Sequence, residues 1–121
     1  MEVFLNGEWI PEEQAQVSAF DRGFLYGDGV FETIRIYQGH PFLLERHLGR
    51  LTHGLSGLHI EDPFSFDEWT DRCRELIARN KVSDGILRLY ITRGTGKRGY
   101  SSMGCSSPTV LISLHDAPPV A

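Results

Sequence analysis

The chain has 121 residues, of which 40% are hydrophobic and 23% charged, and its formal net charge is −4. This length allows one domain with one modest core, and the composition is typical of a globular chain and not of a disordered one. The negative charge argues against a nucleic-acid-binding surface, and no apolar run approaches the length of a membrane span. Two cysteines do not make a disulfide framework. We therefore expect a cytoplasmic protein with no nucleic-acid or membrane partner.

The first part of the chain predicts strands followed by a helix. Residues 3–5 and 8–10 flank Asn6-Gly7, which is a strong hairpin signal. Residues 30–37 alternate, so that one face is aliphatic and the other carries aromatic and polar side chains. Glu32 lies on the aliphatic face, where an unpaired carboxylate is costly, and we expect it to pair with an arginine or to cap backbone amides. A short strand is expected over residues 41–43.

Two helices and two strands complete the expected fold. Leucines recur at helical spacing from Leu44 to Leu58. A second helix is predicted from about Ser65, with Glu68 completing a capping box, to about Asn80. Alternation over residues 86–93 places Leu87, Leu89 and Ile91 inward and Arg88 and Tyr90 outward, and a last strand follows over residues 109–114. The order predicts an α+β fold, an antiparallel sheet with two helices packed on one face.

The segment from Asp21 to Arg35 is the most informative part of the chain. Its glycines free the backbone around Asp28, and arginines, acids and aromatic residues crowd beside them. The segment resembles the N-terminal signature of the fold-type IV, or class IV, pyridoxal-phosphate enzymes, which include branched-chain aminotransferases, D-amino acid aminotransferases and aminodeoxychorismate lyases. Residues 4–11, 37–51 and 88–100 resemble further motifs of that family, in the same order.

The resemblance implies a domain organisation and a cofactor. Residues 1–115 correspond to the smaller N-terminal domain of such enzymes and residues 116–121, with paired prolines, to the interdomain linker. The second domain, which carries the Schiff-base lysine, is expected to be missing. Lys81 follows a predicted helix end and Lys97 lies in a glycine loop, so neither is a candidate, and no catalytic residue is assigned to this chain. The intact protein is expected to bind pyridoxal 5'-phosphate and to form a homodimer.

The resemblance also implies binding residues. An arginine guanidinium can bind phosphate through two hydrogen bonds, and Arg50 occupies the position of the cofactor-phosphate arginine. Tyr26, Phe31 and Arg35 occupy positions around the substrate. Arg88 can reach the same pocket from the Tyr90 face, and Arg98, in the loop over residues 94–100, is expected to bind the substrate carboxylate.

The residues of these motifs do not decide which branch of the family the chain resembles most. The substrate is expected to be an amino acid or keto acid, or aminodeoxychorismate, and the chemistry that of an aminotransferase or a lyase. The chain alone, without the lysine, is expected to be inactive. The alternative function is a stand-alone, non-catalytic dimerisation or anion-binding module.

Overall fold

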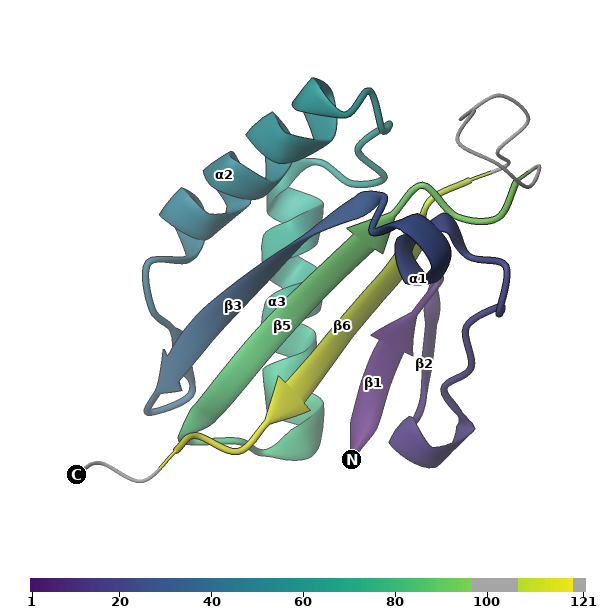
Figure 1. Cartoon of the computed structure of the whole chain (residues 1–121). Helices are drawn as coiled ribbons and strands as arrows, with labels where there is room; N and C mark the ends of the chain where they lie inside the picture. The colour runs from purple at the N-terminus through teal and green to yellow at the C-terminus, as the bar shows by residue number, and fades with distance from the viewer. Residues whose placement is uncertain (97–106, 119–121) are drawn as a thin grey trace.

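A six-stranded antiparallel sheet with helices on both sides forms the architecture (Figure 1). The computed structural model describes residues 1–96 and 107–118. The strands follow the order β2-β1-β6-β5-β3-β4 across the sheet. They are β1 (Glu2–Leu5), β2 (Glu8–Pro11), β3 (Gly29–Tyr37), β4 (His40–Pro41), β5 (Gly85–Thr92) and β6 (Thr109–His115). The helices are α1 (Arg22–Tyr26), α2 (Leu44–Gly57) and α3 (Phe66–Asn80), with one 3-10 turn, η1 (Glu12–Gln14).

The two long helices cover one face of the sheet, behind the strands in Figure 1. The leucine stripe of α2 and the apolar stripe of α3 pack against the inward side chains of β3, β5 and β6. A fully buried aliphatic side chain of this kind stabilises the fold by about 1.5–3 kcal/mol. The core residues with no more than 1% exposure include Ile34, Leu48, Leu51, Leu55, Trp69, Leu76, Leu87, Leu89 and Ile112. The expected α+β fold is confirmed.

The predicted hairpin turn and the predicted helix cap both form in the structure. Asn6 and Gly7 both have positive φ, 49° and 92°, as a tight two-residue hairpin turn between β1 and β2 requires. The Ser65 hydroxyl accepts a hydrogen bond from the Glu68 amide, and the Glu68 carboxylate accepts one from the Ser65 amide. This reciprocal pair satisfies two otherwise unpaired amides at the start of α3.

Two segments differ from the expectation. The strand predicted at residues 41–43 is only His40–Pro41, because Leu43 takes a left-handed conformation, φ 56°, and caps α2. The glycine-rich segment, for which no helix was predicted, contains the five-residue helix α1, which is too short to show a helical period in the sequence. Asp21 caps its start and Gly27, with φ 67°, ends it.

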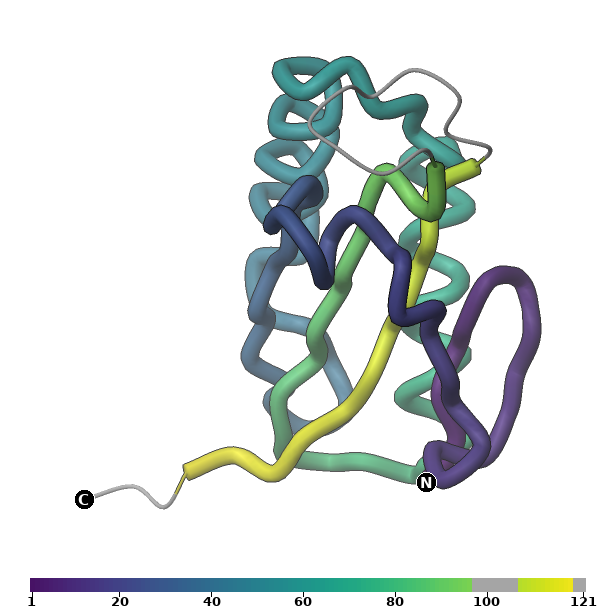
Figure 2. The backbone as a smooth tube through the Cα atoms, turned by 45° about the vertical axis from the view of Figure 1, so that its right-hand side comes forward, coloured from purple at the N-terminus to yellow at the C-terminus, as the bar shows by residue number. Residues whose placement is uncertain are grey.

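The face opposite α2 and α3 is half covered. Figure 2 shows the chain between β2 and α1 running along this face, and Val3 and Leu5 of β1 are buried there. On the other half of the same face, Phe31 is 65% exposed. The sheet therefore has an open surface over β3 and β5. No helix in the described part of the chain is long and apolar enough to cross a membrane.

Candidate functional site

The open surface carries an aromatic pair next to a guanidinium. Phe31 of β3 and Tyr90 of β5 are cross-strand partners, with ring centroids 6.5 Å apart and planes inclined by 29°. Arg88 donates a hydrogen bond from Nη1 to the Tyr90 hydroxyl oxygen at 3.2 Å. Since that oxygen accepts from Arg88, the hydroxyl proton can be donated elsewhere. The group offers a flat apolar wall with two hydrogen-bond donors beside it.

A hollow of about 350 Å³ lies beside this pair, between α1 and the sheet. Glycines keep α1 and β3 close to β5, since a Cβ on Gly29 would lie 2.5 Å from the carbonyl oxygen of Ile91 and one on Gly23 would overlap the Thr92 side chain. Tyr26 ends α1, and its ring centroid lies 4.8 Å from the Arg22 guanidinium carbon. The hollow is lined by Gly23, Gly27, Gly29, Val30, Phe31, Tyr90, Ile91 and Thr92.

Arg35 lies at the other end of β3. Its Nη1 donates to the carbonyl oxygens of Ile36, at 2.6 Å, and Gly85, at 2.9 Å, and its guanidinium lies over the Tyr37 ring. Four residues of strand separate it from Phe31, roughly 13 Å. The structure therefore does not bring Arg35 into the hollow beside Phe31. Arg98 lies outside the described residues.

Arg50 is held by the buried acid of β3. Glu32, whose side chain is 6% exposed, accepts hydrogen bonds from Arg50 Nε at 2.9 Å and Nη2 at 2.8 Å. The expected pairing of Glu32 with an arginine is confirmed. His47 also contacts Glu32, through Nδ1 at 2.7 Å.

The ion pair between Glu32 and Arg50 shifts the pKa values of both side chains. Burial raises the pKa of Glu32, but hydrogen bonds from Arg50 and His47 outweigh it, so that the pKa lies below its ordinary value. The same hydrogen bond, with the charge of Glu32, raises the pKa of Arg50. The Arg50 side chain remains 71% exposed and borders a hollow of about 260 Å³, which Leu43, Arg46 and His47 also line.

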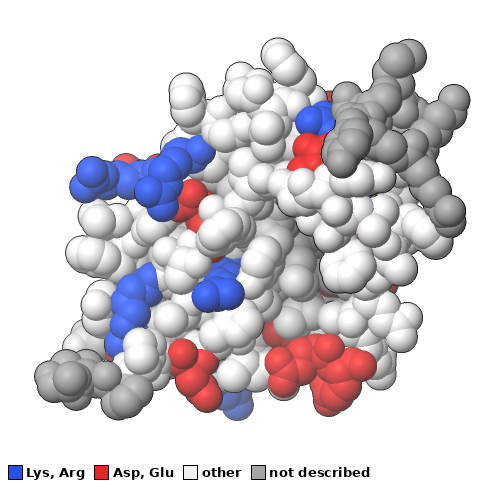
Figure 3. All heavy atoms as spheres, in the orientation of Figure 1, with Lys and Arg blue, Asp and Glu red and all other residues white. Residues whose placement is uncertain are grey.

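Arg50 and Phe31 approach β3 from opposite faces. Glu32 points to the helix side with Ile34 and Ile36, whereas Phe31 points to the open side. Only Ile36 and Tyr37 of β3 pair with β4, so the first part of β3 is an edge of the sheet within the described residues. The two hollows thus flank this edge. On the face seen in Figure 3, basic side chains gather toward β3 and α2, and acidic ones below β1 and β2.

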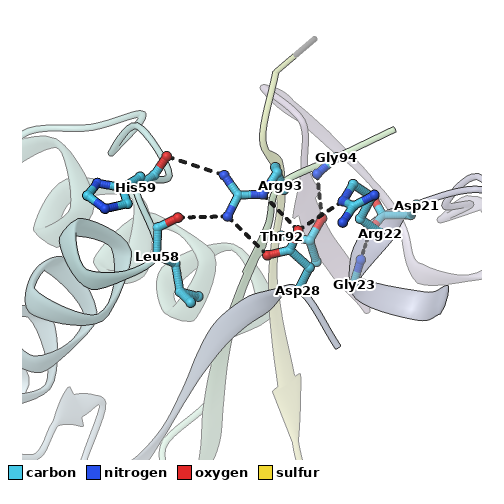
Figure 4. A network of polar contacts seen from close by, with 9 residues as sticks. All are labelled: Asp21, Arg22, Gly23, Asp28, Leu58, His59, Thr92, Arg93 and Gly94. Atoms are coloured by element: carbon cyan, nitrogen blue, oxygen red, sulfur yellow. Dashed lines mark hydrogen bonds and ion pairs between the residues drawn. The ribbon is translucent and has the colours of Figure 1, made fainter. Parts of the chain in front are cut away.

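A second buried charge group was not predicted from the sequence (Figure 4). The Asp28 carboxylate accepts from Arg22 Nε at 2.9 Å and from Arg93 Nε at 2.7 Å. Hydrogen bonding from Arg93 lowers the pKa of Asp28 most; burial opposes this and Arg22 reinforces it, and the resulting pKa lies below the ordinary value. The only available signal was the presence of Arg22 and Asp28 in the glycine-rich segment, since Arg93 joins them through the fold. Residues 1–96 and 107–118 contain no cluster of His, Cys, Asp and Glu that could hold a metal ion.

Comparison with known proteins identifies the family. The family model described as amino-transferase class IV matches residues 29–121. The chain is 40% identical over 120 residues to a putative branched-chain-amino-acid aminotransferase of Methanocaldococcus jannaschii, covering 99% of this chain and 42% of the relative. It is 40% identical over 119 residues to aminodeoxychorismate lyase of Bacillus subtilis, covering 97% of this chain and 41% of the relative.

Solved structures agree with the sequence relatives. The crystal structure of 4-amino-4-deoxychorismate lyase from Pseudomonas aeruginosa matches with a TM-score of 0.78 and 37% identity, over 96% of this chain and 40% of that one. A hypothetical aminotransferase from Mycobacterium tuberculosis, solved in a PLP-bound form, matches with a TM-score of 0.81 and 28% identity, over 98% of this chain and 40% of that one. The chain belongs to the class IV aminotransferase family. It spans about two fifths of the length of these relatives.

Proposed function

We propose that this chain supplies cofactor-phosphate and substrate-carboxylate contacts to a pyridoxal-phosphate-dependent class IV aminotransferase or lyase. The observation that carries the proposal is the arrangement of Arg50, whose guanidinium is fixed on one edge by Glu32 and borders a basic hollow. The relatives include a putative branched-chain aminotransferase and an aminodeoxychorismate lyase. We therefore propose an amino acid, a keto acid or aminodeoxychorismate as the substrate. From the family resemblance we also propose a homodimer, and from the sequence composition a cytoplasmic location.

The residues around Arg50 fit a phosphate monoester. Glu32 occupies Nε and one side of Nη2, and Nη1 has no hydrogen-bond partner among the described residues, so the outer edge of the guanidinium can bind an anion. Arg46 lines the same hollow and adds positive charge. Pyridoxal phosphate, when bound, supplies an electron sink for the substrate. In this proposal Arg50 holds its phosphate and Glu32 keeps the guanidinium oriented.

The open surface fits the substrate. Arg88 and the Tyr90 hydroxyl offer donors to a carboxylate, and Phe31 forms the apolar wall next to them. Tyr26 is the last residue of α1, whose Gly23 lines the hollow beside Phe31, and Arg98 follows β5 in the chain. Arg35 supports the far end of β3 and acts on the pocket wall through the strand. The chain is expected to be inactive alone, since neither of its lysines is proposed to bind the cofactor.

The experiment that tests this proposal compares a variant of the proposed phosphate-binding residue, Arg50, with a variant of the proposed carboxylate-binding residue, Arg98. In a longer protein that contains this chain, Arg50→Ala is expected to weaken the binding of pyridoxal phosphate. The loss of visible absorbance on dialysis measures this effect. Arg98→Ala is expected to lower kcat/KM about ten- to hundredfold with the cofactor retained, because a hydrogen bond to a charged group contributes about 1.5–3 kcal/mol. Arg74→Ala, an exposed arginine on α3, is the control. Equal cofactor loss in the Arg50 and Arg98 variants contradicts the division of roles.

A further inference from the structure

Ion pairs and hydrogen bonds hold helix α1 in place, and its side chains contribute almost nothing to the apolar core. Arg22 is its only buried residue, whereas Phe24, Leu25 and Tyr26 are 76%, 42% and 37% exposed. A five-residue helix has no stability of its own, because nucleation costs more than so few hydrogen bonds return. The contacts that fix α1 must therefore come from outside the helix.

The Asp28 carboxylate provides the central contact (Figure 4). It binds Arg22 of α1 on one side and Arg93, the residue after β5, on the other. The side chains of Arg22, Asp28 and Arg93 are 5%, 14% and 16% exposed. Burying three charged side chains costs desolvation free energy. Helix α1 buries no apolar side chain that would offset this cost.

Arg93 extends this connection to the end of α2. Its Nη2 donates to the Leu58 carbonyl oxygen at 2.7 Å, and its Nη1 to that of His59 at 3.3 Å. These carbonyls follow the last turn of α2, where a cation is favoured by the helix dipole. The Arg93 amide also donates to the Asp28 carbonyl oxygen at 3.0 Å. One carboxylate thus joins α1, β5 and the end of the helix that carries Arg50.

We infer that Asp28 is a positioning residue that fixes α1, and with it Tyr26, relative to β5 and α2. This inference rests on the proposed function, since Tyr26 belongs to the proposed substrate site and Arg50 to the proposed phosphate site. The Arg22 guanidinium is the link to Tyr26, because it binds Asp28 and lies 4.8 Å from the Tyr26 ring centroid. Asp28 acts on the substrate side of the site through Arg22 and leaves the Glu32–Arg50 pair untouched.

Amide hydrogen exchange on the 121-residue chain tests the fixing of α1. The amides of Leu25, Gly27 and Asp28 donate hydrogen bonds within and around α1. In Asp28→Asn they are expected to exchange about ten- to hundredfold faster, the effect of losing a charge-assisted hydrogen bond in a locally opening segment. The amides of Leu89 and Ile112 in the sheet are expected to keep their rates. Arg93→Lys, which retains the charge but not the forked geometry, is expected to show the same local pattern.

The control is Glu75→Gln, which removes an acid from an exposed ion pair with Arg79 and is expected to leave α1 unchanged. Unchanged exchange in α1 in both Asp28→Asn and Arg93→Lys overturns the inference. So does a uniform acceleration of α1 and sheet amides, which assigns Asp28 to general stability alone.

Ligand titration separates this inference from the proposed function. With inorganic phosphate and with 4-methylvalerate as probes, the wild-type chain is expected to show NMR shifts at Arg50 and Tyr26, respectively. Asp28→Asn is expected to lose at least half of the Tyr26 response and to keep the Arg50 response. Absence of both responses in the wild type contradicts the proposed function, while the exchange result still decides the role of Asp28. A wild-type Tyr26 response that Asp28→Asn leaves intact overturns the positioning role.

Discussion

Glu32 and Arg50 form a forked pair in which a buried carboxylate holds an exposed guanidinium. Nε and Nη2 of Arg50 lie 2.9 and 2.8 Å from the two carboxylate oxygens of Glu32. The acid is 6% exposed and the arginine 71% exposed. Glu32 of β3 therefore determines the direction in which the free edge of the exposed Arg50 guanidinium points.

Replacing Glu32 by Gln is expected to destabilise the chain. The neutral amide loses charge-assisted hydrogen bonds from Arg50 and His47 and leaves a buried polar group poorly paired, at a cost of about 1–3 kcal/mol. Urea unfolding measures the difference in free energy. Glu61→Gln, at an exposed position, is the control and is expected to stay within about 0.5 kcal/mol of wild type. Equal stability of the two variants would show that the pair contributes nothing.

Stability is expected to fall toward acid pH. The pKa values of Glu32 and Asp28 lie below their ordinary values of 4.5 and 3.8 in the folded chain. The stabilisation from these groups is therefore fully present above about pH 5 and is lost as the pH falls through the folded pKa values. Urea unfolding between pH 2 and 7 should show this slope, and a Glu32→Gln, Asp28→Asn double variant should show a shallower one. An equally steep slope in the double variant contradicts the assignment to these two acids.

Alanine at Gly23 and at Gly49 is expected to act in opposite directions. A Cβ at Gly23 would overlap the Thr92 side chain, so α1 must shift away from β5, at a cost of about 1–3 kcal/mol. A Cβ at Gly49, in the middle of α2, meets nothing within 4 Å. Gly49→Ala is expected to stabilise the chain by about 0.5–1 kcal/mol, because alanine has the higher helix propensity. Thermal unfolding of both variants checks the signs, and a stabilised Gly23→Ala would contradict the close approach of α1 to β5.

Cys73 is expected to be unreactive in the folded chain. It is 0% exposed, and burial raises the pKa of its thiol to about 12, so that almost no thiolate is present at neutral pH. In a Cys105→Ser variant, labelling by a disulfide reagent should follow the rate of unfolding. Labelling faster than unfolding would show that α3 opens locally.

Pyridoxal phosphate followed by borohydride is expected to modify no single lysine of this chain stoichiometrically. Lys81, at the end of α3, is exposed and is not beside either hollow. Peptide mapping locates any adduct. Stoichiometric labelling of Lys81 or Lys97 alone would contradict the proposal that the chain requires a lysine from elsewhere.

Local interactions allowed the sequence to predict most of the fold. The Asn6-Gly7 turn, the Ser65 and Glu68 cap and the alternation of β3 and β5 each depend on residues close together in the chain, and all are confirmed. The family motifs marked Arg50 and Phe31 as candidates, and the outward direction of Phe31 followed from the two-residue period of a strand.

Only the tertiary structure decided how the charged groups pair. The sequence required a partner for Glu32, but Arg50 is 18 residues away and was selected by the packing of α2 on β3. Asp28 and Arg93 are 65 residues apart, and they meet because β3 and β5 are neighbours in the sheet. The short helix α1 is likewise tied to the rest of the fold by contacts such as the Arg22–Asp28 pair. Ion pairs depend on which elements meet in space, and no periodicity in the chain encodes that meeting.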